Sequence, residues 1–253
     1  SPTICETNAR SLFTKWRPVP NAHAYRVQYQ IVNEKALNII SENWTTIHKN
    51  FEYPNQMVEI PDLLPATYYR VRIQDYNELF GWNPSANCSP VCTLHDRPED
   101  AIEPWVVHTS TTSLRLKCHA PCCNGSNLHS LEYLCRPVES SAEAEECTET
   151  VACSVEWNGR MEELAGRKEI LEFTVSKLMT FVNYTVSIRF QNEHGWGNWS
   201  EFCDPCKTEA SAPEPPLNVR AADVTPPQIA LEWDAPETDN GSPVQNYKLE
   251  MKT

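Results

Sequence analysis

Cysteine and histidine side chains lie together at two places where their spacing could bind a metal ion. The pattern C-x-x-C occurs late in the chain, and the pattern C-H-x-x-C-C occurs near its middle. The residues are Cys203, Cys206, Cys118, His119, Cys122 and Cys123. Zinc accepts these ligands, but the doubled C-x-x-C spacing of a zinc ribbon is absent. A redox C-x-x-C favours a helix N-terminus, which lowers a thiol pKa, whereas Cys203 falls in a predicted strand. We therefore expect no metal and no other cofactor.

The remaining reactive side chains form no catalytic pattern. None of the seven histidines lies in a nucleophile, phosphate-loop or metalloprotease motif. They are His23, His48, His95, His108, His119, His129 and His194. The sequence predicts a protein that is not an enzyme; the alternative is an enzyme whose active site lies elsewhere in a longer parent chain.

Composition and charge limit the partners. The 253 residues carry a formal net charge of -13 and a pI near 5.0. Such a balance disfavours electrostatic binding to nucleic acid or to an anionic membrane. No apolar run has the length that a membrane-spanning helix needs. We expect protein partners, no nucleic acid and no direct membrane contact from this segment.

One pattern of residues occurs twice, 115 positions apart. The run V-x-I-x-x-L-x-P-x-T-x-Y extends from Val58 to Tyr69, and F-x-V-x-x-L-x-T-x-V-x-Y extends from Phe173 to Tyr184. Both continue through alternating apolar positions to Asn-Glu, Gly-Trp, Ser, Cys and Pro. This period is too long for a solenoid repeat and matches a small domain.

Apolar residues recur at every second position, which places them on one face of a strand. The clearest runs are Leu12-Thr14-Trp16, Tyr25-Val27-Tyr29, Tyr69-Val71-Ile73, Leu114-Leu116-Cys118, Tyr133-Cys135, Tyr184-Val186-Ile188-Phe190 and Ile229-Leu231-Trp233. Strands with one wet face build antiparallel sheets that stack as a sandwich. The segment 63–69 is typical of a tyrosine corner, in which the Tyr69 phenol bonds upstream backbone, and Tyr184 is its counterpart.

These residues resemble the fibronectin type III domain, over essentially the whole chain. Trp16 and Trp233, each followed by a nearby proline, match the family's strand-B tryptophan. Tyr25, Tyr133 and Tyr247 match its strand-C tyrosine. The resemblance implies an all-β fold of tandem immunoglobulin-like β-sandwiches, the third one incomplete.

The repeat and the resemblance together predict three domains. The first covers residues 1–96 and the second covers residues 97–211, with an extended C–C′ loop. The third, residues 212–253, carries only strands A to C and cannot close its own core. We expect the chain to be part of a longer protein, joined to flanking domains through short proline-containing linkers.

The second domain departs from the family pattern. Cys118 stands where the strand-B tryptophan is expected, and Thr180 replaces the corner proline. Residues 136–156 are longer than the matching segment of the first domain and rich in glutamate. We interpret them as a solvated acidic loop; a calcium or partner site is the alternative.

The chain has eleven cysteines, although an ordinary fibronectin type III domain needs no disulfide. Cys118 and Cys135 could bridge the two sheets, and Cys147 and Cys153 could staple the long loop, each bridge contributing about 2–4 kcal/mol. The alternative is that Cys118 and Cys135 are small buried hydrophobes. The odd number leaves at least one cysteine without a partner inside this segment.

Six N-x-S/T sequons exceed the number that chance predicts and favour a secreted or cell-surface glycoprotein. We take Asn43, Asn183, Asn198 and Asn124 as candidate acceptors; Asn87 and Asn240 complete the set.

The segment Trp196-Gly-Asn-Trp199-Ser is similar to the Trp-Ser-x-Trp-Ser box of cytokine receptors. That resemblance implies a Trp–Arg ladder, with Arg189 stacked between the two rings. The alternative is an ordinary corner between strands F and G that carries two aromatic residues.

The sequence therefore predicts a non-catalytic protein-binding and spacing module, a segment of a larger adhesion or receptor-type protein outside the cell or at its surface. The alternative is an intracellular scaffold segment of a cytoskeletal, muscle or ciliary protein. The sequence does not identify the binding partner.

Overall fold

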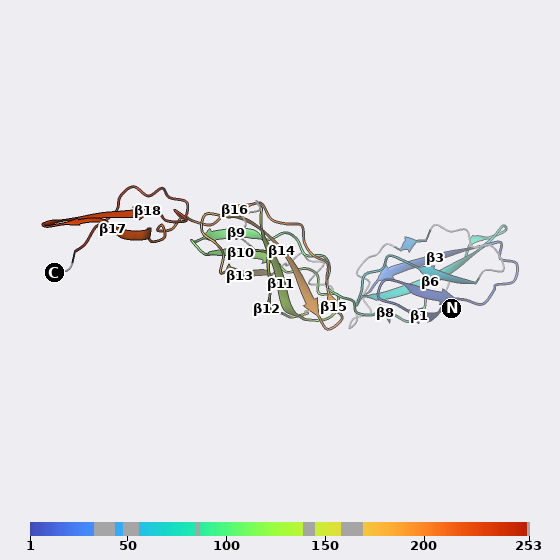
Figure 1. Cartoon of the computed structure of the whole chain (residues 1–253). Helices are drawn as coiled ribbons and strands as arrows, with labels where there is room; N and C mark the ends of the chain where they lie inside the picture. Colours follow the sequence, from blue (N-terminus) through green and yellow to red (C-terminus); the bar gives the residue numbers. More distant parts are fainter. Residues whose placement is uncertain (33–43, 48–55, 84–86, 139–144, 158–168, 252–253) are drawn as a thin grey trace.

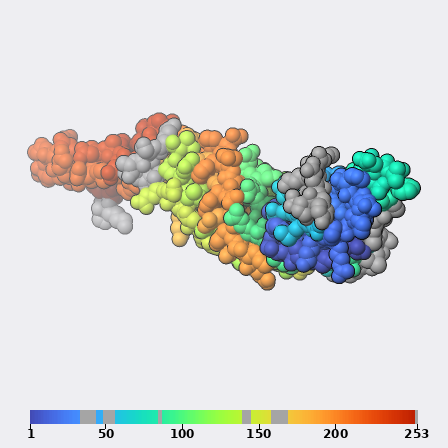
Figure 2. Space-filling view, turned by 90° about the vertical axis from the view of Figure 1, so that its right-hand side faces the viewer, coloured from blue at the N-terminus to red at the C-terminus, as the bar shows by residue number. Residues whose placement is uncertain are grey.

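The computed structural model describes residues 1–32, 44–47, 56–83, 87–138, 145–157 and 169–251. Three groups of strands follow one another along an elongated molecule (Figures 1 and 2). We call them unit one (residues 1–96), unit two (97–211) and unit three (212–253), after the predicted boundaries. The described residues form strands and turns without a helix, so the predicted all-β sandwich fold is confirmed.

Unit one consists of two antiparallel sheets. The first has the order β1-β2-β5 and the second the order β4-β3-β6-β7, with β8 also paired to β6. The bounds are β1 Thr3–Thr7, β2 Leu12–Lys15, β3 Ala24–Ile31, β4 Thr45–Thr46, β5 Met57–Ile60, β6 Tyr68–Asn77, β7 Gly81–Trp82 and β8 Val91–Cys92. The inward positions of the alternating runs form its core, which includes Leu12, Trp16, Val27, Ile60 and Val71.

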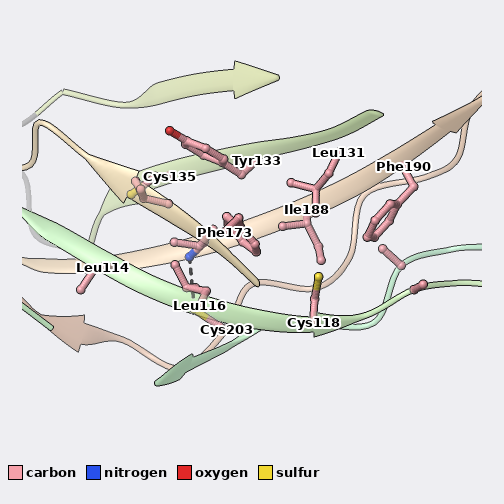
Figure 3. Packing of buried hydrophobic residues seen from close by; sticks show 14 of the residues in the cluster. Leu114, Leu116, Cys118, Leu131, Tyr133, Cys135, Phe173, Ile188, Phe190 and Cys203 are labelled. Carbon is pink, nitrogen blue, oxygen red and sulfur yellow. Dashed lines mark hydrogen bonds between the residues drawn. The ribbon is translucent and has the colours of Figure 1, made fainter. Parts of the chain in front are cut away.

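Unit two repeats this topology. Its sheets have the orders β13-β10-β9 and β12-β11-β14-β15, with β16 also paired to β14. The bounds are β9 Trp105–Thr109, β10 Ser113–His119, β11 Leu128–Pro137, β12 Cys147–Val155, β13 Ile170–Ser176, β14 Asn183–Asn192, β15 Gly195–Trp196 and β16 Cys206–Lys207. Figure 3 shows Leu116 and Cys118 of one sheet facing Tyr133, Cys135 and Ile188 of the other.

A buried tyrosine closes the corner that precedes the central strand in units one and two. The Tyr69 hydroxyl accepts a hydrogen bond from the Leu64 N–H at 2.9 Å, and the Tyr184 hydroxyl accepts one from the Met179 N–H at 3.0 Å. Each bond ties a turn to the strand that follows it, because donor and acceptor lie five residues apart. The hydrogen bond thereby fixes the conformation of the corner at one end of the sandwich.

Residues 145–157 differ from the predicted acidic loop. Nine of them form β12, which pairs with β11 from Leu128↔Val155 to Cys135↔Cys147. Cys147, Val151, Cys153 and Val155 pack against the core, so this segment carries the same alternation as the other strands. The Tyr133 hydroxyl donates a 2.6 Å hydrogen bond to Glu149, which gives one of the acids a cross-strand partner.

Unit three contains the pair β17 Leu217–Thr225 and β18 Gln228–Asp234. The predicted third strand around Tyr247 does not form within described residues 212–251. In units one and two the corresponding strand pairs with a central partner, β3 with β6 and β11 with β14. Without such a partner its backbone has no ladder to join.

Candidate functional site: the junctions between units

Asn124 and Gly125 form a left-handed turn between β10 and β11. Their φ angles are 53° and 101°, a region that asparagine tolerates and that glycine enters without steric penalty. This turn lies at the end of unit two that meets unit one. It therefore places two unusual backbone positions directly at the junction.

Two hydrogen bonds join this turn to the linker that leaves unit one. The Asp96 N–H donates to the Asn124 carbonyl at 3.1 Å. The Asn124 side-chain amide donates to the Arg97 carbonyl at 2.8 Å, and the residue is wholly buried. Asn124 thus binds the linker through both its backbone and its side chain.

Gly125 allows the two units to approach closely. A Cβ atom at this position would lie 2.5 Å from the Ala66 Cβ and 2.8 Å from the His95 Cγ. Ala66 belongs to the corner that the Tyr69 hydroxyl stabilises. Only a residue without a side chain lets the turn of unit two rest against that corner.

The turn between β14 and β15 adds further contacts. The Asn192 amide donates to the Asp96 carbonyl at 2.8 Å and to the Cys123 carbonyl at 3.0 Å. The His194 and His95 rings meet edge-on at 5.6 Å between centroids. An exposed ion pair between Arg10 and Asp96, 2.9 Å, lies beside them. Both turns at this end of unit two therefore form hydrogen bonds with the same short linker.

The junction between units two and three has the same construction. Asn240 and Gly241 have φ angles of 51° and 84°. The Ser211 N–H donates to the Asn240 carbonyl at 3.1 Å, and the Asn240 amide donates to the Ala212 carbonyl at 2.7 Å. Gly241 lies directly against the Phe181 ring.

The residues on the unit-one and unit-two sides of these junctions obey the sequence repeat. Asp96 and Ser211, Arg97 and Ala212, and Ala66 and Phe181 are each 115 positions apart. We call the arrangement the Asn–Gly clamp: a left-handed Asn, a positive-φ Gly, two hydrogen bonds to the linker and contact with the tyrosine corner. Thr180, the residue that replaces the corner proline, donates to the Asn240 side chain at 3.0 Å. Its hydroxyl gives the second clamp one more bond.

The sequence contains a signal for the clamp, which is the same tripeptide that predicts a glycosylation site. Asn-Gly-Ser occurs at 124–126 and again at 240–242, in each case shortly before the strand-C tyrosine position. The sequon predicts a glycan at Asn124, but the buried Asn124 amide bonds the linker, which leaves no room for a glycan in this packing. This correction follows from the close approach of the two units.

The other candidate acceptors have different surroundings. Asn198 is exposed and donates to Asp100 at 2.8 Å. Asn183 is half-buried at the start of β14. Asn43 lies outside the described residues. Asn183 and Asn198 therefore remain the candidate acceptors that the structure places at the surface.

Arginine side chains stack on aromatic rings along the exposed face of the β11–β14 sheet. The Arg189 guanidinium lies 4.8 Å from the Trp196 ring centroid and 4.5 Å from that of Trp199, and it pairs with Glu132 at 2.5 Å. Unit one has related contacts, with Arg72 over Trp44 at 4.1 Å and Arg26 over Trp82 at 4.5 Å. Each stack is worth about 0.5–1 kcal/mol at an exposed site.

The four cysteines proposed as disulfides are thiols in the structure, and their neighbours differ from the expected pairs. Cys147 and Cys153 lie six residues apart on one extended strand, about 20 Å at strand rise, which is far beyond disulfide reach. Cys135 instead faces Cys147, and Cys118 lies near Cys153. Burial raises the pKa of Cys118 to about 12 and that of Cys153 to about 11.

Across the described ranges, no three His, Cys, Asp or Glu side chains converge on a metal-binding geometry. The same residues include no helix with the length and apolar character for crossing a bilayer.

Comparisons with known proteins place this architecture. No family model matches the chain. Human protein sidekick-1 is 31% identical over 215 residues, which cover 82% of this chain and 9% of that protein. Mouse protein sidekick-2 is 28% identical over 256 residues, covering 98% of this chain and 11% of that protein. The chain thus spans about a tenth of the length of these relatives.

Two further matches have names that refer to fibronectin type III domains. Chicken fibronectin type-III domain-containing protein 3a is 24% identical over 270 residues, 99% of this chain and 20% of that protein. The crystal structure of chicken CNTN1 FN1-FN3 domains superposes with a TM-score of 0.54 and 16% identity, covering 92% of this chain and 73% of that one.

Fold and junctions define a protein of serially joined immunoglobulin-like sandwiches. With the sequence relatives, they show that the chain belongs to the fibronectin type III superfamily, as a tandem segment.

Replacing Gly125 with alanine should open the first junction. The new Cβ would overlap Ala66 and His95 and would strain a φ of 101°. We expect hydrogen exchange of the Asp96 and Glu99 amides, which bond Asn124 and Cys122, to accelerate about tenfold or more. Amide exchange measured by mass spectrometry or NMR checks this.

Gly81→Ala is the matched control, because Gly81 also has a positive φ, 73°, but has no atom within 4 Å of its would-be Cβ. Unchanged exchange at Asp96 in Gly125→Ala, or equal acceleration in both variants, would show that Gly125 does not hold the junction.

Proposed function

We propose that this chain is a non-catalytic spacing and protein-binding segment of a larger adhesion or receptor-type protein at the cell surface. The observation that carries the proposal is the Asn–Gly clamp, which makes the same two bonds at both junctions to linker residues that are 115 positions apart. A chain whose modules only needed to be linked would not require an asparagine bonded to the linker at each joint, wholly buried at the first and half-buried at the second.

The clamp supports spacing because it converts a linker into a fixed joint. Each junction has two hydrogen bonds between the asparagine and the linker, one in each direction, worth about 1 kcal/mol each in net terms. Loss of the buried Asn124 partner would add a desolvation penalty of about 1–3 kcal/mol. A bend at the joint must break these bonds together, so neighbouring units keep one relative orientation.

Exposed side chains on unit one support the binding part of the proposal. Leu79 and Phe80, at the turn between β6 and β7, are 84% and 80% exposed, and Trp82 follows at 40%. Apolar side chains grouped at a turn are typical of contact points for another protein. The equivalent turn of unit two contacts unit one through His194.

The cell-surface setting has separate support. The excess of sequons and the number of cysteines favour the secretory pathway. Sequence similarity to the sidekick proteins, and over 80 residues to rat neogenin at 34% identity, is consistent with it. An intracellular scaffold would need neither feature.

The double substitution Asn124→Ala and Asn240→Ala should turn both joints into hinges. We expect small-angle X-ray scattering to show one narrow distribution of maximum dimensions for the native chain and a clearly broader one for the variant. The reason is that each substitution removes the side-chain hydrogen bond to the linker and places alanine at a left-handed φ, while leaving the cores intact.

Asn218→Ala is the matched control. Asn218 also has a left-handed φ, 51°, but its amide bonds Asp234 inside unit three at 2.7 Å. Identical scattering from the native chain and the double variant would contradict a spacing role.

Glycan mapping of protein from its native source tests the setting. We expect glycans at Asn43, Asn183 or Asn198 and none at Asn124, because the Asn124 amide is buried against the linker. A glycan at Asn124 would contradict the packing of the junction. Absence of glycan from all four would contradict the cell-surface setting and favour the intracellular scaffold.

A further inference from the structure

Cys135 and Cys147 lie directly opposite each other on β11 and β12. Opposed residues of antiparallel strands have Cα atoms about 4.5 or 5.5 Å apart, depending on the type of pair. Both distances fall inside the range of about 4.4–6.8 Å that a disulfide spans. The two thiols already share a hydrogen bond, so their sulfur atoms point toward each other.

The register that opposes these thiols is firmly set. Two residues further along, the Tyr133 hydroxyl donates to Glu149 across the same pair of strands at 2.6 Å. A slip by one residue would turn one cysteine out of the core, because successive side chains point to opposite faces. β12 is the edge strand of its sheet, with β11 as its neighbour.

The two thiols differ in their surroundings. Cys135 is wholly buried, and Figure 3 shows it pointing into the core beside Phe173. Cys147 is only partly buried and lines a cleft of about 460 Å³ together with Glu145, Glu146 and Lys177. A small molecule can therefore reach Cys147 but not Cys135.

Chemical reactivity follows the same order. The hydrogen bond with Cys135 lowers the pKa of Cys147 to about 7, and the same bond together with burial raises the pKa of Cys135. Thiolate is the reactive form. Cys147 is thus the accessible nucleophile and Cys135 the buried partner.

We propose that Cys147 and Cys135 are a redox site, in which Cys147 reacts with a small disulfide such as oxidised glutathione and Cys135 then closes a cross-strand disulfide. This goes beyond the spacing role and does not depend on it. The product ties the edge strand covalently to the central strands of unit two.

The reaction balances as thiol–disulfide exchange. The Cys147 thiolate attacks one sulfur of the small disulfide, whose S–S bond breaks and releases one thiolate. That thiolate takes up the proton that Cys147 had released to water. Cys135 then attacks the Cys147 sulfur, and its proton passes to the second small thiolate as the mixed disulfide breaks. Two protein thiols are oxidised, and one small disulfide is reduced to two thiols.

Cys203 is the competitor for Cys135. Its sulfur accepts a hydrogen bond from the Val186 N–H at 3.3 Å, and Val186 pairs with Cys135 across the sheet. However, burial raises the pKa of Cys203, and Cys203 lines a different cleft from the one that Cys147 lines. It lacks the accessible thiolate that starts the exchange.

The test is to incubate the whole native chain with oxidised and reduced glutathione, alkylate the remaining thiols and map the linked peptides. We expect a peptide joining Cys135 to Cys147, and a melting temperature for unit two about 5–10 °C higher than in the reduced chain. Cys147→Ser should leave Cys135 alkylatable, whereas Cys5→Ser should still give the 135–147 link.

Cys5 also reports on the oxidant, because it is exposed in unit one. The proposal would be overturned if Cys135 and Cys147 both remained thiols while Cys5 carried glutathione. So would a link from Cys135 to Cys203 or Cys118.

Discussion

The relative placement of the units depends on a backbone conformation that most residues avoid. At each junction an asparagine takes a φ near 50° and a glycine follows with a positive φ. The left-handed region costs an ordinary residue about 1–2 kcal/mol, so these two residue types are selected by the geometry. Each sandwich can bury its core without this turn. The joint cannot form without it, because the turn presents a carbonyl and an amide to the linker at once.

The clamp reuses a feature that stabilises each sandwich internally. The buried hydroxyls of Tyr69 and Tyr184 hold the corners that contain Ala66 and Phe181. Those same corners receive Gly125 and Gly241 of the next unit. One local hydrogen bond therefore fixes both the turn of its own unit and the surface on which the following unit rests. This coupling explains how a chain of small domains can keep a defined shape with short linkers.

The strands could be predicted from alternation, because a half-buried sheet leaves a direct record in the sequence. Leu114, Leu116 and Cys118, for example, occupy the inward positions of β10. β12 was missed because its glutamates suggested a solvated loop, although Cys147, Val151, Cys153 and Val155 alternate in the same way. The strand at Tyr247 is predicted from the resemblance to the family's strand-C tyrosine, and within the described residues it has no pairing partner. The cysteine pairs could not be derived, since pairing depends on register, which a single sequence does not specify.

The clamp illustrates the same limit at a functional position. Asn-Gly-Ser is at once a sequon and a left-handed turn, and only the neighbouring unit decides which property matters. Nitrogen-15 relaxation of the native chain would test directly whether the clamp joins the units. Amides of units one and two should report one shared rotational diffusion tensor. Two different tensors, each matching a single tumbling domain, would show that the units move independently and that the clamp does not hold them.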